Sequence, residues 1–171
     1  TRAWFVDNGY ETIPKYGPLP ISVPGCGDGW VELHKRFGKL TMRSVLRAAI
    51  EAAELGVVVP QTIAEYWRRG VADRQDQPGF REVFMPWGRG PEEGERFQNH
   101  ALKRTLIRIA KLGRGGFYEG PVADALAAFV REHGGFLSKQ DLLAHRSEWV
   151  EPVSTNYRGY DVWELPPNGQ G

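Results

Sequence analysis

The spacing of the apolar residues changes once along this chain, and that change restricts the fold more than any other feature of the sequence. From residue 28 to residue 145 apolar side chains recur at helical spacing, which gives each helix one apolar face. Residues 150 to 165 instead read as two strands around a tight Arg158-Gly159 turn, where glycine can take the positive φ that a hairpin requires. The sequence therefore predicts an α+β chain that is mainly helical, with about six helices over 28–145 and one C-terminal β-hairpin over 150–165.

Capping residues indicate where each helix begins and ends. The expected starts, each at a polar cap or beside a proline, are Asp28, Thr41, Pro60, Asn99, Gly120-Pro121 and Ser138. The expected ends, each at a glycine, are Gly38, Gly56, Gly70, Gly113 and Gly134-Gly135. Two of these positions carry a more specific prediction. Gly38 is expected to end its helix in a left-handed conformation, and Ser138 with Asp141 resembles an acidic variant of the capping box.

The segments between the helices are rich in Gly and Pro and are expected to be irregular. Residues 1–27 have one expected short strand, over 19–23. Residues 70–98 are expected to form a loop with a single turn of helix over 79–84. The sequence contains no internal repeat, so the chain is expected to form part of one domain.

Length and charge exclude several classes of function. With 171 residues the chain has the length of one ordinary domain. It carries 22 Lys and Arg residues against 21 Asp and Glu residues, and this balance gives no reason to expect nucleic acid or an anionic membrane as a partner. No apolar stretch approaches the roughly 20 residues that span a bilayer. A single cysteine excludes an internal disulfide.

That cysteine lies in a glycine-rich motif, Gly25-Cys26-Gly27-Asp28-Gly29, just before an expected helix. The simplest interpretation is a structural turn. A thiol at a helix N-terminus can also act as a nucleophile, and closely spaced glycines can form part of a nucleotide-binding loop. The dinucleotide fingerprint, however, needs its third glycine one residue later, a βαβ unit and an acidic residue about 20 positions further on. The turn is therefore favoured.

The other titratable residues give no catalytic or metal-binding pattern. The histidines, which lie far apart and are expected at the surface or at helix ends, are His34, His100, His133 and His145. The acidic run over residues 92–95 is expected to be a solvated loop. The basic residues expected to form one exposed helix face are Lys103, Arg104, Arg108 and Lys111.

Five stretches, in this order, resemble the large-subunit region of the gamma-glutamyltransferases (glutathione hydrolases). They are Ile21-Ser22-Val23-Pro24-Gly25 with Asp28-Gly29-Trp30; Gly38-Lys39-Leu40 with the Ala-rich helix and Gly56; Phe117-Tyr118-Glu119-Gly120; Gly134-Gly135-Phe136-Leu137-Ser138 with Asp141-Leu142; and Tyr157-Arg158-Gly159-Tyr160 leading to Pro166-Pro167-Asn168-Gly169-Gln170-Gly171. Each stretch alone is weak, but their order and spacing extend over nearly the whole chain.

The resemblance implies a fold and a reaction. Members of this family have the four-layer αββα fold of N-terminal-nucleophile hydrolases and are made as one precursor that cuts itself. The new N-terminal Thr of the small subunit attacks a γ-glutamyl amide and passes the acyl group to water or to an amino acid. This chemistry needs a nucleophile, a base and oxyanion donors in one place. In the family, the nucleophile and the oxyanion donors belong to the small subunit, downstream of the region that this chain resembles.

The resemblance also decides which residues can act. The substrate-binding arginine of the large subunit lies in an Arg-Glu-x-Ala-Pro stretch that would end just before Thr1, so Arg2 is not expected to be that residue. Thr1 is not expected to be the nucleophile, although an N-terminal Thr can use its own amine as a base. No catalytic, cofactor-binding or metal-binding residue and no cofactor are therefore predicted for residues 1–171. Both ends of the chain look cut.

Two departures from the family pattern are visible. Gly27 stands where the family often has a bulkier residue, and it is expected to loosen the helix that follows. The closing Asn168-Gly169-Gln170-Gly171 differs from the Ser-Ser-Gly-Gly of the members that cleave glutathione. This second departure leaves the substrate open.

Three functions follow from the sequence. The first is a segment of a self-processing gamma-glutamyltransferase, inactive alone, whose partners are the remainder of its own precursor and a γ-glutamyl substrate. The second is an acylase of the same superfamily, acting on cephalosporin side chains or small amides. The third is a non-enzymatic helical binding module, which would expose an apolar patch to its partner. The compartment stays open, since periplasmic or secreted members are common and a cytoplasmic one is possible.

Overall fold

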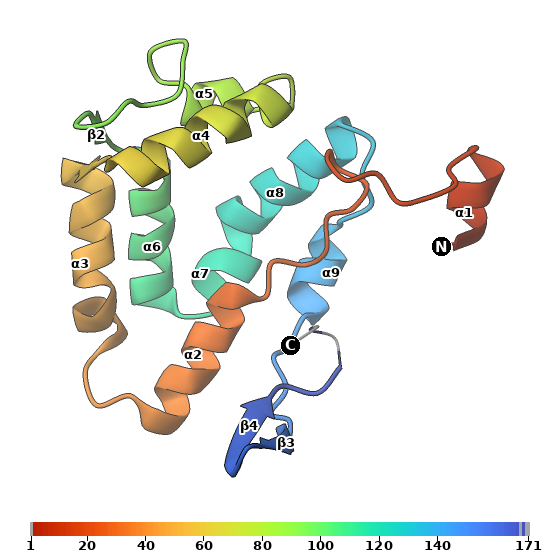
Figure 1. Ribbon diagram of the computed structural model, residues 1–171, viewed down its shortest axis with the longest axis vertical. Helices are drawn as coiled ribbons and strands as arrows, with labels where there is room; N and C mark the ends of the chain where they lie inside the picture. Colours follow the sequence, from red (N-terminus) through yellow and green to blue (C-terminus); the bar gives the residue numbers. More distant parts are fainter. Residues whose placement is uncertain (1, 168, 170–171) are drawn as a thin grey trace.

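The computed structural model describes residues 2–167 and 169 and consists of helices followed by one hairpin (Figure 1). The helices are α1 Arg2–Asp7, α2 Cys26–Phe37, α3 Met42–Leu55, α4 Gln61–Arg74, α5 Phe80–Phe84, α6 His100–Leu112, α7 Gly115–Tyr118, α8 Gly120–Glu132 and α9 Lys139–Ala144. The strands are β1 Val57–Val58, β2 Arg96–Phe97, β3 Val153–Tyr157 and β4 Tyr160–Glu164. The predicted mainly helical chain with a C-terminal hairpin is confirmed.

Two small groups of buried side chains hold the helices together, and Phe117 packs against both. In one group Leu46 of α3 packs with Leu106 and Ile109 of α6. The helices α3 and α6 lie side by side in Figure 1. The other group, which joins α7, α8 and α9, is formed by Tyr118, Ala123, Val130, Leu137 and Leu142. A fully buried aliphatic side chain stabilises a fold by roughly 1.5–3 kcal/mol. Each group is therefore a modest source of stability.

Local capping signals predict the helix starts well. The Thr41 hydroxyl accepts a hydrogen bond from the Ser44 N–H at 3.2 Å, and the Asn99 side chain accepts one from the Leu102 N–H at 2.9 Å. The predicted capping box is also present, because Ser138 and Asp141 each accept a hydrogen bond from the backbone N–H of the other. These caps replace the partners that the first N–H groups of a helix lack.

Two predictions near α2 are wrong. Asp28 does not cap the helix: α2 already begins at Cys26, and the Asp28 carboxylate is buried against other elements. Gly38 is not left-handed, since its φ is −68° and its ψ is 129°. Glycine is needed there for space, because a Cβ at Gly38 would lie 2.5 Å from the His34 carbonyl oxygen. The His34 ring nitrogen also contacts the Leu40 carbonyl oxygen at 2.6 Å, which closes this turn.

Other segments differ from prediction because tertiary contacts decide them. The strand expected over 19–23 is absent from the described residues, where this segment pairs with no other strand. Helix α4 continues through Gly70 to Arg74. Its middle is held by Trp67, whose Nε1 donates to the Phe84 carbonyl oxygen at 2.9 Å and whose ring packs on Phe97. The helical turn over 79–84 is confirmed as α5.

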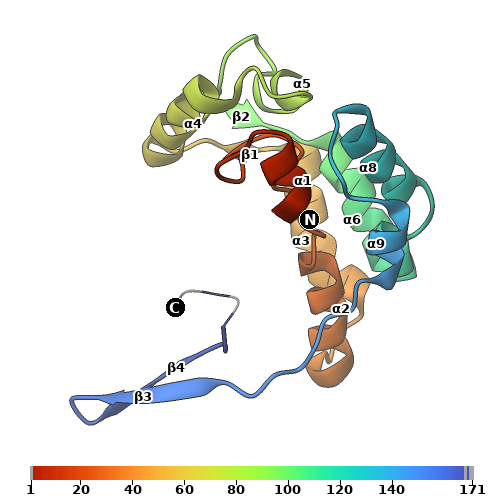
Figure 2. The same ribbon diagram turned by 90° about the vertical axis from the view of Figure 1, so that its right-hand side faces the viewer.

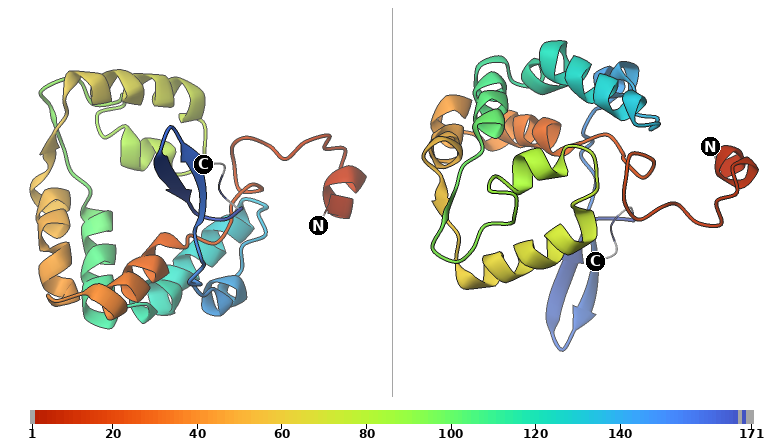
Figure 3. Two further views of the ribbon diagram at one scale, coloured as in Figure 1. Left: turned by 60° about the horizontal axis from the view of Figure 1, so that its bottom comes forward. Right: turned by 90° about the horizontal axis from the view of Figure 1, so that it is seen from above.

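The hairpin is confirmed but is shorter than predicted, since β3 begins at Val153. Arg158 and Gly159 have φ values of 52° and 86°, the two positive values of the turn that best suits a two-residue hairpin. Every residue of both strands is exposed. Figure 2 shows the hairpin projecting away from the helices, and Figure 3 shows that α1 also stands apart from α3 and α6. A two-stranded hairpin without a covering layer is marginally stable in water.

Candidate functional site: a buried ionic cluster at the base of the hairpin

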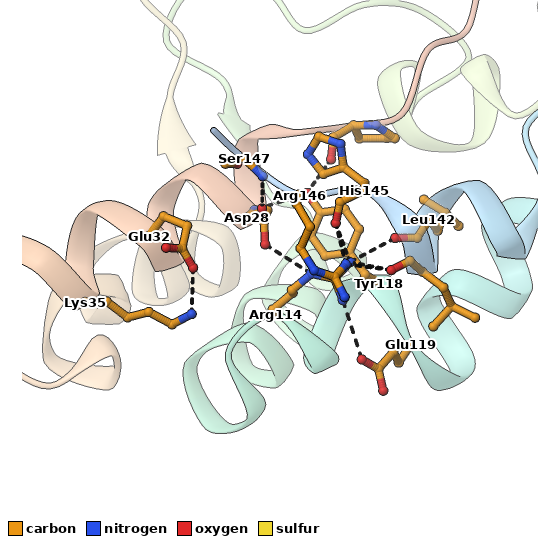
Figure 4. A network of polar contacts seen from close by, with 12 residues as sticks. Asp28, Glu32, Lys35, Arg114, Tyr118, Glu119, Leu142, His145, Arg146 and Ser147 are labelled. Atoms are coloured by element: carbon orange, nitrogen blue, oxygen red, sulfur yellow. Dashed lines mark hydrogen bonds and ion pairs between the residues drawn. The ribbon is translucent and has the colours of Figure 1, made fainter. Parts of the chain in front are cut away.

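A charged residue is buried where the hairpin segment leaves the helices. Asp28, in the first turn of α2, is 1% exposed. Burying a lone carboxylate costs several kcal/mol unless other groups pair with it and donate hydrogen bonds to it. Arg114 and Ser147 do so here, the Tyr118 hydroxyl accepts from the Asp28 main-chain N–H, and the His145 ring stacks on Tyr118. We call Asp28, Arg114, Tyr118, His145 and Ser147 the Asp28 cluster (Figure 4).

Both carboxylate oxygens of Asp28 have a partner. Oδ1 lies 3.1 Å from Arg114 Nε as an ion pair, and Oδ2 accepts a hydrogen bond from the Ser147 N–H at 2.5 Å. The main-chain N–H of Asp28 donates to the Tyr118 hydroxyl at 3.1 Å, and that hydroxyl donates to the Pro24 carbonyl oxygen at 2.5 Å. The cluster therefore joins three parts of the chain that are far apart in sequence.

Arg114 carries the second half of the cluster. Its Nη2 donates to the carbonyl oxygens of Leu142, Leu143 and His145, at 3.1, 2.9 and 2.7 Å. The last carbonyls of a helix have no partner inside the helix, and a cation near them is favoured by the helix dipole. Arg114 thus closes the C-terminal end of α9, while its guanidinium lies 4.8 Å from the centre of the Tyr118 ring.

The cluster favours one protonation state. Burial alone would raise the pKa of Asp28, but the N–H and hydroxyl of Ser147, together with the charges of Arg114 and His145, outweigh it and lower that pKa. Burial raises the pKa of Tyr118, and the negative charge of Asp28 adds to the effect. Asp28 is therefore ionised and Tyr118 is neutral near pH 7, the states that the hydrogen bonds require.

The candidate residues weighed from sequence fall in different places. Cys26 is exposed at the first position of α2, so the glycine-rich motif forms the start of a helix and not the separate turn that was expected. All four histidines lie at or near helix ends, as predicted. Only His145 joins the cluster, where its ring stacks on Tyr118 with the two centres 5.6 Å apart.

Two predictions about charged surfaces need correction. Lys103 is half-buried and pairs with Glu54 at 2.5 Å, and Arg108 is also half-buried, so these two do not belong to an exposed basic face. In the acidic run, residues 92–94 are exposed in a loop as predicted, whereas Glu95 is half-buried. It pairs with Arg89 at 2.7 Å, and mainly this hydrogen-bonded pairing lowers the pKa of Glu95 to about 2.

The arrangement holds backbone segments together and presents no activated nucleophile. Over residues 2–167 and 169, no group of three or more His, Cys, Asp or Glu side chains is placed to hold a metal ion. Within the same residues, no helix is both long and apolar enough to cross a membrane. Sequence reasoning missed the Asp28 cluster because an Asp beside a helix start resembles a cap, and nothing local indicates partners 86 and 119 positions away.

Comparisons with known proteins identify the family. The family model for gamma-glutamyltranspeptidase matches residues 1–171. The glutathione hydrolase-like YwrD proenzyme of Bacillus subtilis is 35% identical over 97% of this chain and 32% of its own length. The oxamate amidohydrolase proenzyme of Klebsiella pneumoniae is 34% identical over 95% of this chain and 32% of its own length. The chain belongs to the gamma-glutamyltranspeptidase family.

A solved structure agrees with the observed fold. The cephalosporin acylase from Bacillus halodurans matches with a TM-score of 0.91 and 40% identity, covering 98% of this chain and 33% of that one. The mainly helical chain with its hairpin thus corresponds to part of a larger enzyme structure. It spans about a third of the length of the relatives named here.

Proposed function

We propose that this chain is part of a precursor that cuts itself and then hydrolyses or transfers the γ-glutamyl group of glutathione or a related amide. The observation that carries the proposal is the match of the gamma-glutamyltranspeptidase family model to residues 1–171. The nucleophilic Thr, the oxyanion donors and most of the substrate-binding side chains would come from the remainder of the precursor. The 171 residues alone are expected to be inactive.

The exposed apolar surface supports the need for that remainder. Among the described residues, large apolar side chains that are exposed outnumber those that are buried. Those of the hairpin are Val153, Tyr157, Tyr160, Val162 and Trp163. Large exposed apolar patches mark surfaces that interact with a partner. We take the remainder of the precursor as the partner that covers them.

A second substrate class has an observation in its favour. The cephalosporin acylase of Bacillus halodurans is 40% identical to this chain, and the relatives also include an oxamate amidohydrolase. The segment Asn168-Gly169-Gln170-Gly171, which differs from the glutathione-cleaving pattern, lies mostly outside the described residues. An acylase acting on another amide is therefore the alternative.

The complete gene product tests both proposals. After expression and purification, the masses of its pieces and the N-terminal sequence of the second piece are measured. We expect a cut downstream of residue 171 that exposes a Thr. The processed enzyme is then assayed with γ-glutamyl-p-nitroanilide, glutaryl-p-nitroanilide and oxamate. Faster turnover of the γ-glutamyl compound supports the first substrate class. An uncut chain without acyl-transfer activity contradicts both.

A further inference from the structure

The hairpin has two unlike faces. In an antiparallel pair of strands, residues that lie directly opposite each other share one side, and successive residues alternate between the sides. One side, here called the apolar face, contains three opposing pairs: Val153 with Glu164, Thr155 with Val162, and Tyr157 with Tyr160. Its four large apolar side chains are 51% to 77% exposed. The apolar face therefore exposes surface whose removal from water would be favourable.

The opposite face pairs its polar groups with one another. Here Ser154 lies opposite Trp163, and Asn156 lies opposite Asp161. The Asn156 Nδ2 donates a hydrogen bond to Asp161 Oδ1 at 2.9 Å, and the Asn156 Oδ1 accepts one from the Gly159 N–H at 3.2 Å. Trp163 is the one large apolar side chain of this face. The opposite face is therefore much better suited to water than the apolar face is.

The helices of this chain leave the apolar face open. Figure 2 shows the hairpin projecting away from them, and every residue of both strands is exposed within the part of the chain that the structure describes. A two-stranded hairpin is marginally stable at best in water unless it packs on another layer. The hairpin therefore needs a partner to keep it folded, and the apolar face is the side that such a partner would contact.

The solved relative indicates which partner this is. The cephalosporin acylase of Bacillus halodurans matches 98% of this chain with a TM-score of 0.91, and this chain covers 33% of the acylase. The hairpin is longer than the unmatched part of this chain, so the match extends into it. A projecting hairpin that recurs within a much longer chain is expected to pack on the additional part of that chain. The remainder of the precursor is therefore favoured over a second copy of these 171 residues.

We propose that an apolar layer of the remainder of the precursor packs on the apolar face, and that the opposite face lies towards water. This inference rests on the proposed function, because it needs the longer precursor. In the complete protein the hairpin is then kept folded by this one-sided contact and not by the helices of its own segment.

Thr155 and Ser154 offer a matched pair of positions for the test. They are neighbours in β3, both carry a small hydroxyl side chain and both are exposed, but Thr155 belongs to the apolar face and Ser154 to the opposite face. In Thr155→Lys the new charge would lie under the apolar layer, which is costly, whereas in Ser154→Lys it reaches water. Because both variants introduce the same side chain into the same strand, a difference between them reports on the face.

The experiment measures amide hydrogen exchange over residues 153–164 in the complete gene product, with α6 as an internal reference. Wild-type exchange should be at least about a hundredfold slower than in an unfolded chain, because the hairpin is docked. Thr155→Lys should speed this exchange at least about tenfold, and Ser154→Lys should leave it within about twofold of the wild type. Unprotected wild-type amides, or equal acceleration by both lysine variants, would overturn the inference.

Two further measurements keep the result decisive. If Thr155→Lys also speeds exchange in α6, so that the whole protein is disturbed, Thr155→Val is used instead. Exchange as slow as in the wild type or slower then supports the inference, and faster exchange overturns it. Sedimentation velocity of the wild type identifies the partner. Protection in a monomeric precursor supports the proposal, whereas protection that grows with association assigns the apolar face to a second copy and contradicts it.

Failure of this inference can be told apart from failure of the proposed function. A gene product that neither cuts itself nor cleaves any of the amides, yet shows the difference between the two lysine variants, loses the proposed function and keeps the docked hairpin. An active, processed enzyme whose hairpin amides exchange freely keeps the proposed function and loses the inference.

Discussion

At the scale of single residues, Asp28 shows how a buried charge ties a fold to pH. Its pKa is lowered in the folded chain relative to the usual value of 3.8. A group of this kind stabilises the fold fully above its unfolded pKa and loses that contribution as the pH falls through the folded value. We therefore expect protection of the α2 amides in the complete precursor to fall below about pH 4.

Asp28→Asn should change this behaviour in a defined way. At pH 7 the variant leaves Arg114 without its buried counter-charge, so local stability of α2 should drop by about 3–5 kcal/mol. Because no carboxylate remains to be protonated at this position, the further loss below pH 4 should be smaller than in the wild type. Hydrogen exchange of α2 amides from pH 7 to pH 3 measures both effects. Parallel pH profiles for the two proteins would contradict the assignment.

Gly27 gives a second prediction at this scale. It lies inside α2, where glycine costs roughly 0.5–1 kcal/mol relative to alanine, and the neighbouring Tyr118 leaves space for a Cβ. Gly27→Ala should therefore stabilise α2 by about 0.5–1 kcal/mol, measured by exchange of the α2 amides. Gly38→Ala is the contrasting variant, because its Cβ would collide with the His34 carbonyl and it should destabilise the same helix. Stabilisation by both variants would contradict this account of the two glycines.

At the scale of elements, α9 depends on its two ends. The capping box of Ser138 and Asp141 closes the start of this six-residue helix, and Arg114 closes its end. Ser138→Ala should cost about 1 kcal/mol, because the Asp141 N–H loses its acceptor. It should also raise the pKa of Asp141, which the Ser138 hydroxyl and N–H hold below its usual range. Exchange of the α9 amides and a carboxyl titration by NMR measure these effects, and an unchanged Asp141 titration would argue against the capping box.

The elements also show what can be predicted from sequence. The helices capped by Thr41, Asn99 and Ser138 were predictable because the cap and the apolar side of each helix lie within one or two turns of sequence. The two-residue strands β1 and β2 were not, because Val57 pairs with Phe97 and neither strand is long enough to carry a pattern. The Asp28 cluster could not be predicted for the same reason. Its chemistry depends on contacts between residues that are far apart in sequence, whereas a local pattern reports only on neighbouring residues.

At the scale of the whole molecule, the exposed hairpin and the small cores predict how the chain behaves without the rest of the precursor. We expect the separately produced 171 residues to self-associate, since unpaired strand edges and apolar faces pair readily with other chains. Sedimentation velocity over a range of concentrations measures this. Val162→Lys, which places a charge on the exposed strand β4, should shift the distribution towards monomer. A wild-type chain that is monomeric at all concentrations would contradict the prediction and favour an autonomous module.

The distance in sequence between Asp28 and Ser147 also has a consequence for synthesis on the ribosome. The two residues are 119 positions apart, and chains grow at about 5–20 residues per second, so roughly 6–24 s pass before the carboxylate can meet its partner. Throughout that interval the Asp28 carboxylate lacks the Ser147 N–H, and burying it without that donor would cost free energy. The buried contact at the start of α2 can therefore form only after Ser147 has been synthesised.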